Sequence, residues 1–162
     1  MQKTRKITTR LKKRDEVFRL LALGEATGLP VLLLGTHGVA KTQAVLDYIG
    51  DEPAYMIQTS MGTRPNDIRG TVDMDHFISH KKYRTISPIA DAAAVVIDEV
   101  DKTNDSVRDM LLSIMREKKL FLGSEGMKQC QWKLFVGSCN KPPIVSPFWD
   151  RFVLRMTVER LP

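Results

Sequence analysis

Residues 31 to 42 read VLLLGTHGVAKT, and this stretch decides the fold. Its first four residues, Val31 to Leu34, form a continuous apolar run that is typical of a buried parallel strand, and a helix is expected from Lys41 to about Tyr48. A glycine-rich turn between a strand and a helix, ending in Lys41-Thr42, is typical of a phosphate-binding loop. The backbone N–H groups of such a loop and the helix N-terminus bind nucleotide phosphates.

The loop therefore predicts nucleotide binding. Lys41 is expected to contact the β- and γ-phosphates of ATP, and the Thr42 hydroxyl to bind Mg²⁺. Ala40 stands where such loops normally carry glycine, so we expect a negative φ there, with the methyl group clear of the phosphates. A purely structural strand-to-helix turn is the alternative, which the Lys-Thr pair disfavours. The predicted nucleotide-binding residues are Gly35, Thr36, His37, Gly38, Val39, Ala40, Lys41 and Thr42.

A second apolar run, Val95 to Ile97, ends in two carboxylates, Asp98 and Glu99. Ligands of open α/β sheets collect at the C-terminal ends of strands, so these carboxylates are expected beside the loop. Asp98 would hold Mg²⁺, in part through water, and Glu99 would polarise the water that attacks the γ-phosphate. The alternative is two solvated acids at a strand end.

Two further polar residues follow near the C-terminus. Asn140 comes directly after the apolar segment Phe135 to Cys139 and is predicted to orient the attacking water or to sense the γ-phosphate, unless it is only a turn former. Arg151 is predicted to act as an arginine finger on the γ-phosphate of a neighbouring subunit, the alternative being a surface pair with Asp150. The sequence thus predicts three catalytic residues and two metal ligands: Glu99, Asn140 and Arg151, with Thr42 and Asp98 for the metal.

Helices and strands alternate along the chain, which predicts an α/β fold whose parallel sheet is covered on both faces. No repeat or linker divides the sequence, so one domain is expected. The expected helices are Lys12 to Gly28, Lys41 to Tyr48 and Thr103 to Glu117. The expected strands are Val31 to Gly35, Ala54 to Ser60, Ala94 to Ile97, Leu134 to Ser138 and Val153 to Val158. Residues 119 to 133 predict a hairpin with strands at 120 to 122 and 129 to 132.

The charge is unevenly distributed over the 162 residues. The net charge is +6, but seven of the 25 Lys and Arg residues precede the first acid, Asp15, which leaves 18 cations against 19 anions in the remainder. Residues 1 to 14 therefore form a basic N-terminal arm and residues 15 to 162 the core domain, and a general nucleic-acid-coating role is not implied. Cys130 and Cys139 fit neither a disulfide framework nor a zinc site. With no apolar run long enough for a membrane span, a soluble cytoplasmic protein is expected.

Together these motifs resemble those of the AAA+ ATPases, and more narrowly the MoxR-type branch, from about Lys12 to the end of the chain. Gly35 to Thr42 is similar to the Walker A motif and Val95 to Glu99 to Walker B. Asn140 resembles sensor 1, and the segment around Arg151 resembles the one that bears the arginine finger. The resemblance implies a three-layer αβα P-loop NTPase core with a five-stranded parallel sheet.

Three more segments fit this branch. Residues 65 to 70 look like the start of its helix 2, residues 71 to 84 occupy the place of the helix 2 insert, and residues 119 to 133 that of the hairpin before sensor 1. In related machines these loops contact a substrate or partner, although an ordinary solvated hairpin is an equal alternative. The insert carries a mixed aromatic and basic set: Phe77, Lys81, Lys82 and Tyr83.

The resemblance implies Mg²⁺-dependent ATP hydrolysis by a homo-oligomer, expected to be hexameric, in which Arg151 completes the site of the next subunit. It also implies remodelling of a protein client, often a partner with a von Willebrand A-type domain. The helical lid of the family has no counterpart before Pro162, so the chain is either a minimal core or a fragment.

Two other functions remain open. One is a nucleotide-gated, DNA-associated assembly or loading factor with little turnover, whose basic arm at residues 1 to 14 would contact DNA phosphates in a salt-dependent way. The other is a P-loop kinase for a small acceptor, which is weaker because it leaves Asn140, Arg151 and the two insertions unexplained.

Overall fold

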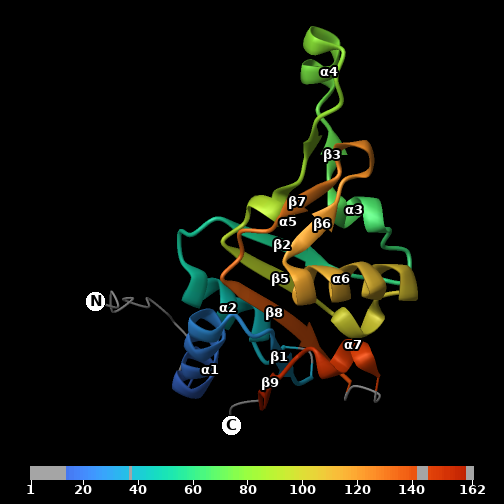
Figure 1. Cartoon of the computed structure of the whole chain (residues 1–162). Coiled ribbons are helices and arrows are strands. Elements are labelled where there is room, and N and C mark those ends of the chain that lie inside the picture. Colours follow the sequence, from blue (N-terminus) through green and yellow to red (C-terminus); the bar gives the residue numbers. More distant parts are fainter. Residues whose placement is uncertain (1–13, 37, 142–145, 160–162) are drawn as a thin grey trace.

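The structure is a computed structural model that describes residues 14–36, 38–141 and 146–159 (Figure 1). Its centre is a five-stranded sheet of order β2-β5-β8-β1-β9, in which every neighbouring pair is parallel. This confirms the predicted fold class. The strands are β1 (Val31–Leu34), β2 (Ala54–Gln58), β5 (Ala94–Asp98), β8 (Leu134–Cys139) and β9 (Leu154–Thr157).

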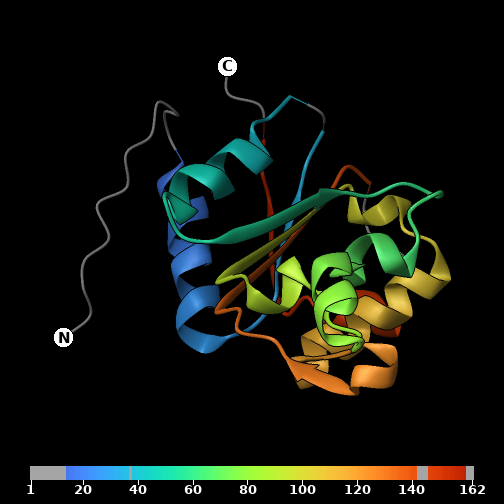
Figure 2. The same ribbon diagram turned by 90° about the horizontal axis from the view of Figure 1, so that it is seen from above.

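Helices cover both faces of this sheet, as Figure 2 shows from above. On one face lie α1 (Asp15–Thr27) and α2 (Lys41–Ile49), whose apolar side chains form one buried cluster with the sheet. On the other face a second buried cluster includes residues of α3 (Pro65–Arg69), α5 (Pro88–Asp91), α6 (Asp105–Glu117) and α7 (Pro147–Asp150). The molecule therefore has the predicted three layers.

The position of each strand in the sheet explains its burial. Every residue of β8 is buried, as are the first four of β5, because these strands have neighbours on both sides and helices on both faces. In β2, which lies at the edge of the sheet, exposed and half-buried residues alternate. The predicted site residues at the ends of β5 and β8 therefore follow deeply buried strands at the centre of the sheet.

Two helix ends differ from the sequence prediction for local reasons. The clearest helix begins at Asp105 and not at Thr103, because the Asn104 side chain accepts a hydrogen bond from the Val107 N–H (3.0 Å) and caps the helix. The first helix begins at Asp15; Lys12 lies outside the described residues. It ends as expected at Gly28, which has φ of +68°.

The hairpin before β8 is shifted relative to its prediction. Its strands are β6 (Lys119–Phe121) and β7 (Met127–Gln129), joined by the short helix η2 (Gly123–Glu125). The prediction of a second strand at residues 129 to 132 was wrong because Gln131 donates its backbone N–H to Ala90 (2.9 Å), outside the hairpin. The segment after β7 therefore joins the core.

The insert between α3 and α5 projects far from the sheet (Figure 1). It consists of β3 (Thr71–Val72), α4 (Met74–His80) and β4 (Thr85–Ile86), with β3 and β4 paired antiparallel. No residue of α4 is buried. Within the described parts of the chain, every helix is too short or too polar to cross a membrane.

Candidate functional site

A cavity of about 230 Å³ opens at the C-terminal ends of β5 and β8, beside the N-terminus of α2. It brings together most of the site residues that the sequence predicted, from three separate segments of the chain. It is lined by Gly38, Val39, Ala40, Lys41, Thr42, Gln43, Gln58, Asp98, Glu99 and Asn140. Gly35 and Thr36 contribute through their carbonyl groups, whereas His37 lies outside the described residues.

Lys41 points its ammonium group back across the loop. Its Nζ donates to the carbonyl oxygens of Gly35 (2.6 Å) and Thr36 (3.0 Å) and to Asn140 Oδ1 (3.0 Å). The residue is only 7% exposed, and burial lowers its pKa from the ordinary lysine value, against the opposing effect of Asp98. The lysine is thus fixed in position at the first turn of α2 by oxygen acceptors alone.

Ala40 departs from the sequence prediction. Its φ is +57°, so the expectation of a negative φ was wrong. The left-handed conformation lets the loop end and α2 begin at the next residue, and it is the backbone geometry that glycine adopts most easily. A non-glycine residue pays conformational strain of about 1 kcal/mol or more at such a position.

Arg14 holds the same loop from outside. The charge pattern groups it with the basic arm, but it is 8% exposed, and its Nη2 donates to the Val39 carbonyl (2.8 Å). Nη1 and Nη2 also reach the carbonyl of Glu159 (3.3 Å each), directly beyond β9. Arg14 therefore links the loop to the end of the last strand, and in the sequence it was hidden within a run of cations.

The Thr42 hydroxyl and the Asp98 carboxylate meet directly, with Oγ1 donating to Oδ2 at 3.0 Å. The other carboxylate oxygen of Asp98 accepts from the Glu99 backbone N–H (3.0 Å) and from the Ser138 hydroxyl. A hydroxyl and a carboxylate side by side are hard oxygen donors of the kind that Mg²⁺ binds. The donor set thus fits the predicted metal, with Asp98 oriented by its neighbours.

Glu99 is turned into the cavity by its backbone, which has φ of +54°. Its side chain accepts from Gln58 Nε2 (2.9 Å) and from Lys102 Nζ (2.8 Å), and Asn140 Nδ2 lies at 3.4 Å. The residue is 8% exposed. Four described non-glycine residues have a left-handed backbone, and two of them, Ala40 and Glu99, line this cavity.

Sequence reasoning missed Gln58 and Lys102. Gln58 is the last residue of β2 and pairs in register with Asp98, so a polar residue at the end of a strand next to β5 was the available signal. Lys102 lies in η1 (Val100–Lys102), and its hydrogen bond to Glu99 raises the pKa of its ammonium. Both residues donate to the Glu99 carboxylate and hold it beside Asn140 in the cavity.

Arg151 is absent from this cavity. It is exposed and follows α7, on the face that carries α6. There it lines a different cavity, of about 310 Å³, together with α6 residues that include Ser113 and Arg116. The predicted catalytic residues therefore divide into two groups, with Glu99 and Asn140 beside the loop and Arg151 on another surface of the same chain.

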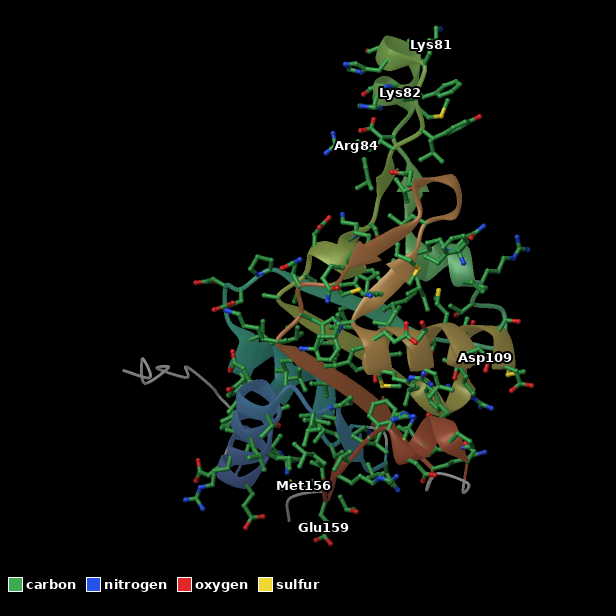
Figure 3. All side chains as sticks on the ribbon, in the orientation of Figure 1. Lys81, Lys82, Arg84, Asp109, Met156 and Glu159 are labelled. Carbon is green, nitrogen blue, oxygen red and sulfur yellow. The ribbon has the colours of Figure 1, made fainter. Side chains whose placement is uncertain are left out.

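The insert and the hairpin present a second candidate surface, which we call the insert surface. Figure 3 shows Lys81 and Lys82 at its far end, with Arg84 closer to the body. Tyr83 stacks on Phe77 with ring centroids 4.7 Å apart. Its large exposed apolar residues are Val72, Met74, Ile78, Tyr83 and Ile86 on the insert and Phe121 and Met127 on the hairpin. The Thr85 hydroxyl donates to Glu125, which joins the two segments.

The strain at Ala40 leads to a stability prediction. Ala40→Gly is expected to raise the free energy of unfolding by about 1 kcal/mol, because relief of the left-handed strain exceeds the added entropy of the unfolded chain. Denaturant unfolding measures this. Gly38→Ala is the matched control: Gly38 has φ of +80° with open space around its Cβ position, so the added methyl group should lower stability by backbone strain alone. Equal stability of Ala40→Gly and the unchanged protein would contradict the left-handed geometry.

Comparisons with known proteins bear on the family and the fold of this chain. A family model described as the MoxR domain in the MoxR-vWA-beta-propeller ternary systems matches residues 1–162. The fold also matches the crystal structure of a candidate ATPase from Cytophaga hutchinsonii, with a TM-score of 0.73 and 25% sequence identity over 93% of this chain and 47% of that one.

Two curated proteins are related to this chain over part of their length. The chain is 30% identical to the structural protein ORF618 of Acidianus two-tailed virus, over 86% of this chain and 24% of that protein. It is 32% identical to an uncharacterized protein of Methanocaldococcus jannaschii, over 79% of this chain and 35% of the relative. The chain thus spans about a quarter to a third of the length of these curated relatives.

Proposed function

Since the chain belongs to the MoxR-type AAA+ ATPases, we propose that it binds and hydrolyses ATP with Mg²⁺ in a homo-oligomer and uses turnover to remodel a macromolecular partner. One observation carries the proposal. The Lys41 ammonium, the Thr42–Asp98 pair and the Glu99 carboxylate, which come from separate segments, converge on one cavity. If the loop were only a turn between a strand and a helix, these side chains would have no reason to meet in one cavity.

The loop and α2 hold the phosphates in this proposal. Lys41 already donates to three oxygen atoms, and the phosphate oxygens of ATP would replace these acceptors at the cavity. The N–H groups at the start of α2 add partial positive charge on the same side. Thr42 and Asp98 would hold Mg²⁺, which when bound neutralises charge on the β- and γ-phosphates.

Glu99 and Asn140 act on the attacking water. The Glu99 carboxylate accepts hydrogen bonds and lies beside Asn140, so a water between them would donate to the carboxylate and be oriented by the amide. Gln58 and Lys102 hold the same carboxylate.

Arg151 acts on a neighbour. It lies outside the cavity of its own chain and lines the cavity between α6 and α7, so a second subunit packed against this face would receive its guanidinium. This arrangement supports a ring, which we propose to be hexameric, in which each site is completed by the next subunit. An isolated subunit then hydrolyses ATP slowly.

The partner is proposed to be a protein. The matching family model is described for ternary systems of MoxR, vWA and β-propeller, which supports a von Willebrand A-type partner for this chain. The insert surface suits such contacts, because it presents exposed apolar side chains next to three cations, Lys81, Lys82 and Arg84. No residue of α4 is buried, so the side of the helix that faces away from the Phe77–Tyr83 stack is open to a partner.

The test is ATP turnover as a function of protein concentration, with oligomer mass measured by light scattering in the same samples. Turnover per subunit is expected to rise with assembly and to require Mg²⁺. Lys41→Met is the binding control and should lose ATP affinity. Constant turnover per subunit across the assembly transition would contradict a shared site.

A second outcome would favour the other candidate function. Tight ATP binding and assembly without turnover would indicate a nucleotide-gated scaffold, with DNA as the next ligand to test. In that case deletion of residues 1 to 13 should reduce DNA binding, and the remaining binding should fall with salt concentration. Most of the basic arm lies outside the described residues, so this alternative depends on its charge alone.

A further inference from the structure

A second arginine binds the turn that carries Arg151. Arg155, on β9, donates from Nε to the Phe152 carbonyl (2.8 Å) and from Nη2 to the Trp149 carbonyl (2.6 Å). These two carbonyl groups lie on either side of Arg151 in the sequence. The Asp150 carboxylate is 3.9 Å from the same Nη2. One planar guanidinium thus binds the backbone before and after Arg151.

Buried aromatic residues anchor the rest of this turn. Phe152 is fully buried, with its ring centroid 5.7 Å from that of Phe148 and 6.3 Å from that of Phe135 on β8. Gly137 leaves the space in β8 into which the Phe152 ring packs. The buried Phe152 ring thus anchors the residue after Arg151, and Arg155 binds the carbonyl groups on both sides of Arg151 in the sequence.

We propose that Arg155 is a positioning residue that sets the direction in which Arg151 points toward the neighbouring subunit. The proposal rests on the shared-site function proposed above. A guanidinium suits this role better than an ammonium because its planar fork can bind two carbonyls at once in a fixed geometry. Without the guanidinium, Phe152 stays buried, but the carbonyl groups of Phe152 and Trp149 each lose a charge-assisted hydrogen bond.

The first experiment compares Arg155→Gln with Arg155→Lys. Arg155→Gln should lower ATP turnover of the assembled protein by about tenfold to a hundredfold, because small displacements of a positioned group have effects of that size. Arg155→Lys should recover part of this loss, since lysine can reach one of the two carbonyls. Arg19→Gln, which changes an exposed arginine of α1, is the matched control and should keep full turnover.

Binding and assembly are measured on the same samples. The affinity for ADP and the oligomer mass should stay unchanged in Arg155→Gln, because the loop and its cavity lie elsewhere. Retention of ADP with aluminium fluoride, which imitates the transferring phosphoryl group, should fall as it does in Arg151→Ala. The double variant Arg151→Ala/Arg155→Gln should lose no more than Arg151→Ala alone, since both changes act through one guanidinium.

A mixing experiment separates this role from a simple folding defect. Arg155→Gln subunits have an intact cavity, and Glu99→Gln subunits have an intact Arg151 turn. Mixed assemblies should therefore regain turnover that neither variant has alone. Failure of the mixture to regain turnover, or additive losses in the double variant, would overturn the proposal. If Arg151→Ala itself leaves turnover unchanged, the shared site fails, and with it the proposed function rather than the positioning role alone.

Discussion

Arg151→Ala is expected to reduce the ATP turnover of the assembled protein by about 10³- to 10⁵-fold, the range found for arginine fingers supplied in trans. The charge that develops on the γ-phosphate during transfer would have no counter-charge from the next subunit. ATP affinity should change little, because Arg151 is absent from the residues that line the cavity of its own chain. Steady-state turnover at protein concentrations above and below assembly measures the effect.

Arg116→Ala is an informative companion to this variant. Arg116 lines the same cavity as Arg151, but it comes from α6, outside the turn whose carbonyl groups Arg155 binds. A loss confined to Arg151→Ala would locate the trans contact at the turn after α7. Unchanged, concentration-dependent turnover in Arg151→Ala would contradict the shared site, and the Asp150 and Arg151 side chains would then be surface residues only.

The sequence was sufficient to predict the sheet and the convergence of its strand ends. Continuous apolar runs such as Val31 to Leu34 occur where both faces of a strand are covered, and this constraint leaves few other arrangements. In a parallel sheet the C-terminal ends of all strands lie at one edge. The proximity of Asp98 and Asn140 to Lys41 followed from that geometry, although 99 residues separate Lys41 from Asn140.

The rest depended on contacts that no local pattern contains. The conformation of Ala40 could not be predicted because a left-handed residue is set by what surrounds the loop, here including the Arg14 bond to the Val39 carbonyl. Arg14 itself, like Arg155, is one arginine in a chain with 25 Lys and Arg residues. Their partners are backbone carbonyls, which every residue has, so sequence alone cannot assign them.

The hairpin shows a similar limit. The turn-like residues between two segments predicted a strand from Gln129 to Trp132, but the backbone N–H of Gln131 donates to the carbonyl of Ala90, in a helix about 40 residues earlier. Competition between a local hairpin partner and a distant one is settled by packing. Trp132, which is almost fully buried and lies over Phe135 with centroids 5.5 Å apart, favours the distant partner.

Glu99→Gln is expected to lower ATP turnover by about 10²- to 10⁴-fold while leaving ATP binding intact. The amide keeps the size of the carboxylate and one oxygen that can accept from Gln58 or Lys102, so the cavity should retain its shape. It can no longer take a proton from the attacking water. Single-turnover hydrolysis and ATP affinity, measured on the same preparation, separate the chemical step from binding.

Asp105→Asn is the matched control, because it makes the same carboxylate-to-amide change at an exposed position in the first turn of α6. It should keep full turnover. If Glu99→Gln hydrolyses ATP at the rate of the unchanged protein, the base must be another group. Loss of ATP binding together with turnover would instead mean that the bonds from Gln58, Lys102 and Asn140 to Glu99 hold the cavity in shape. The substitution is therefore informative only when binding and hydrolysis are measured together.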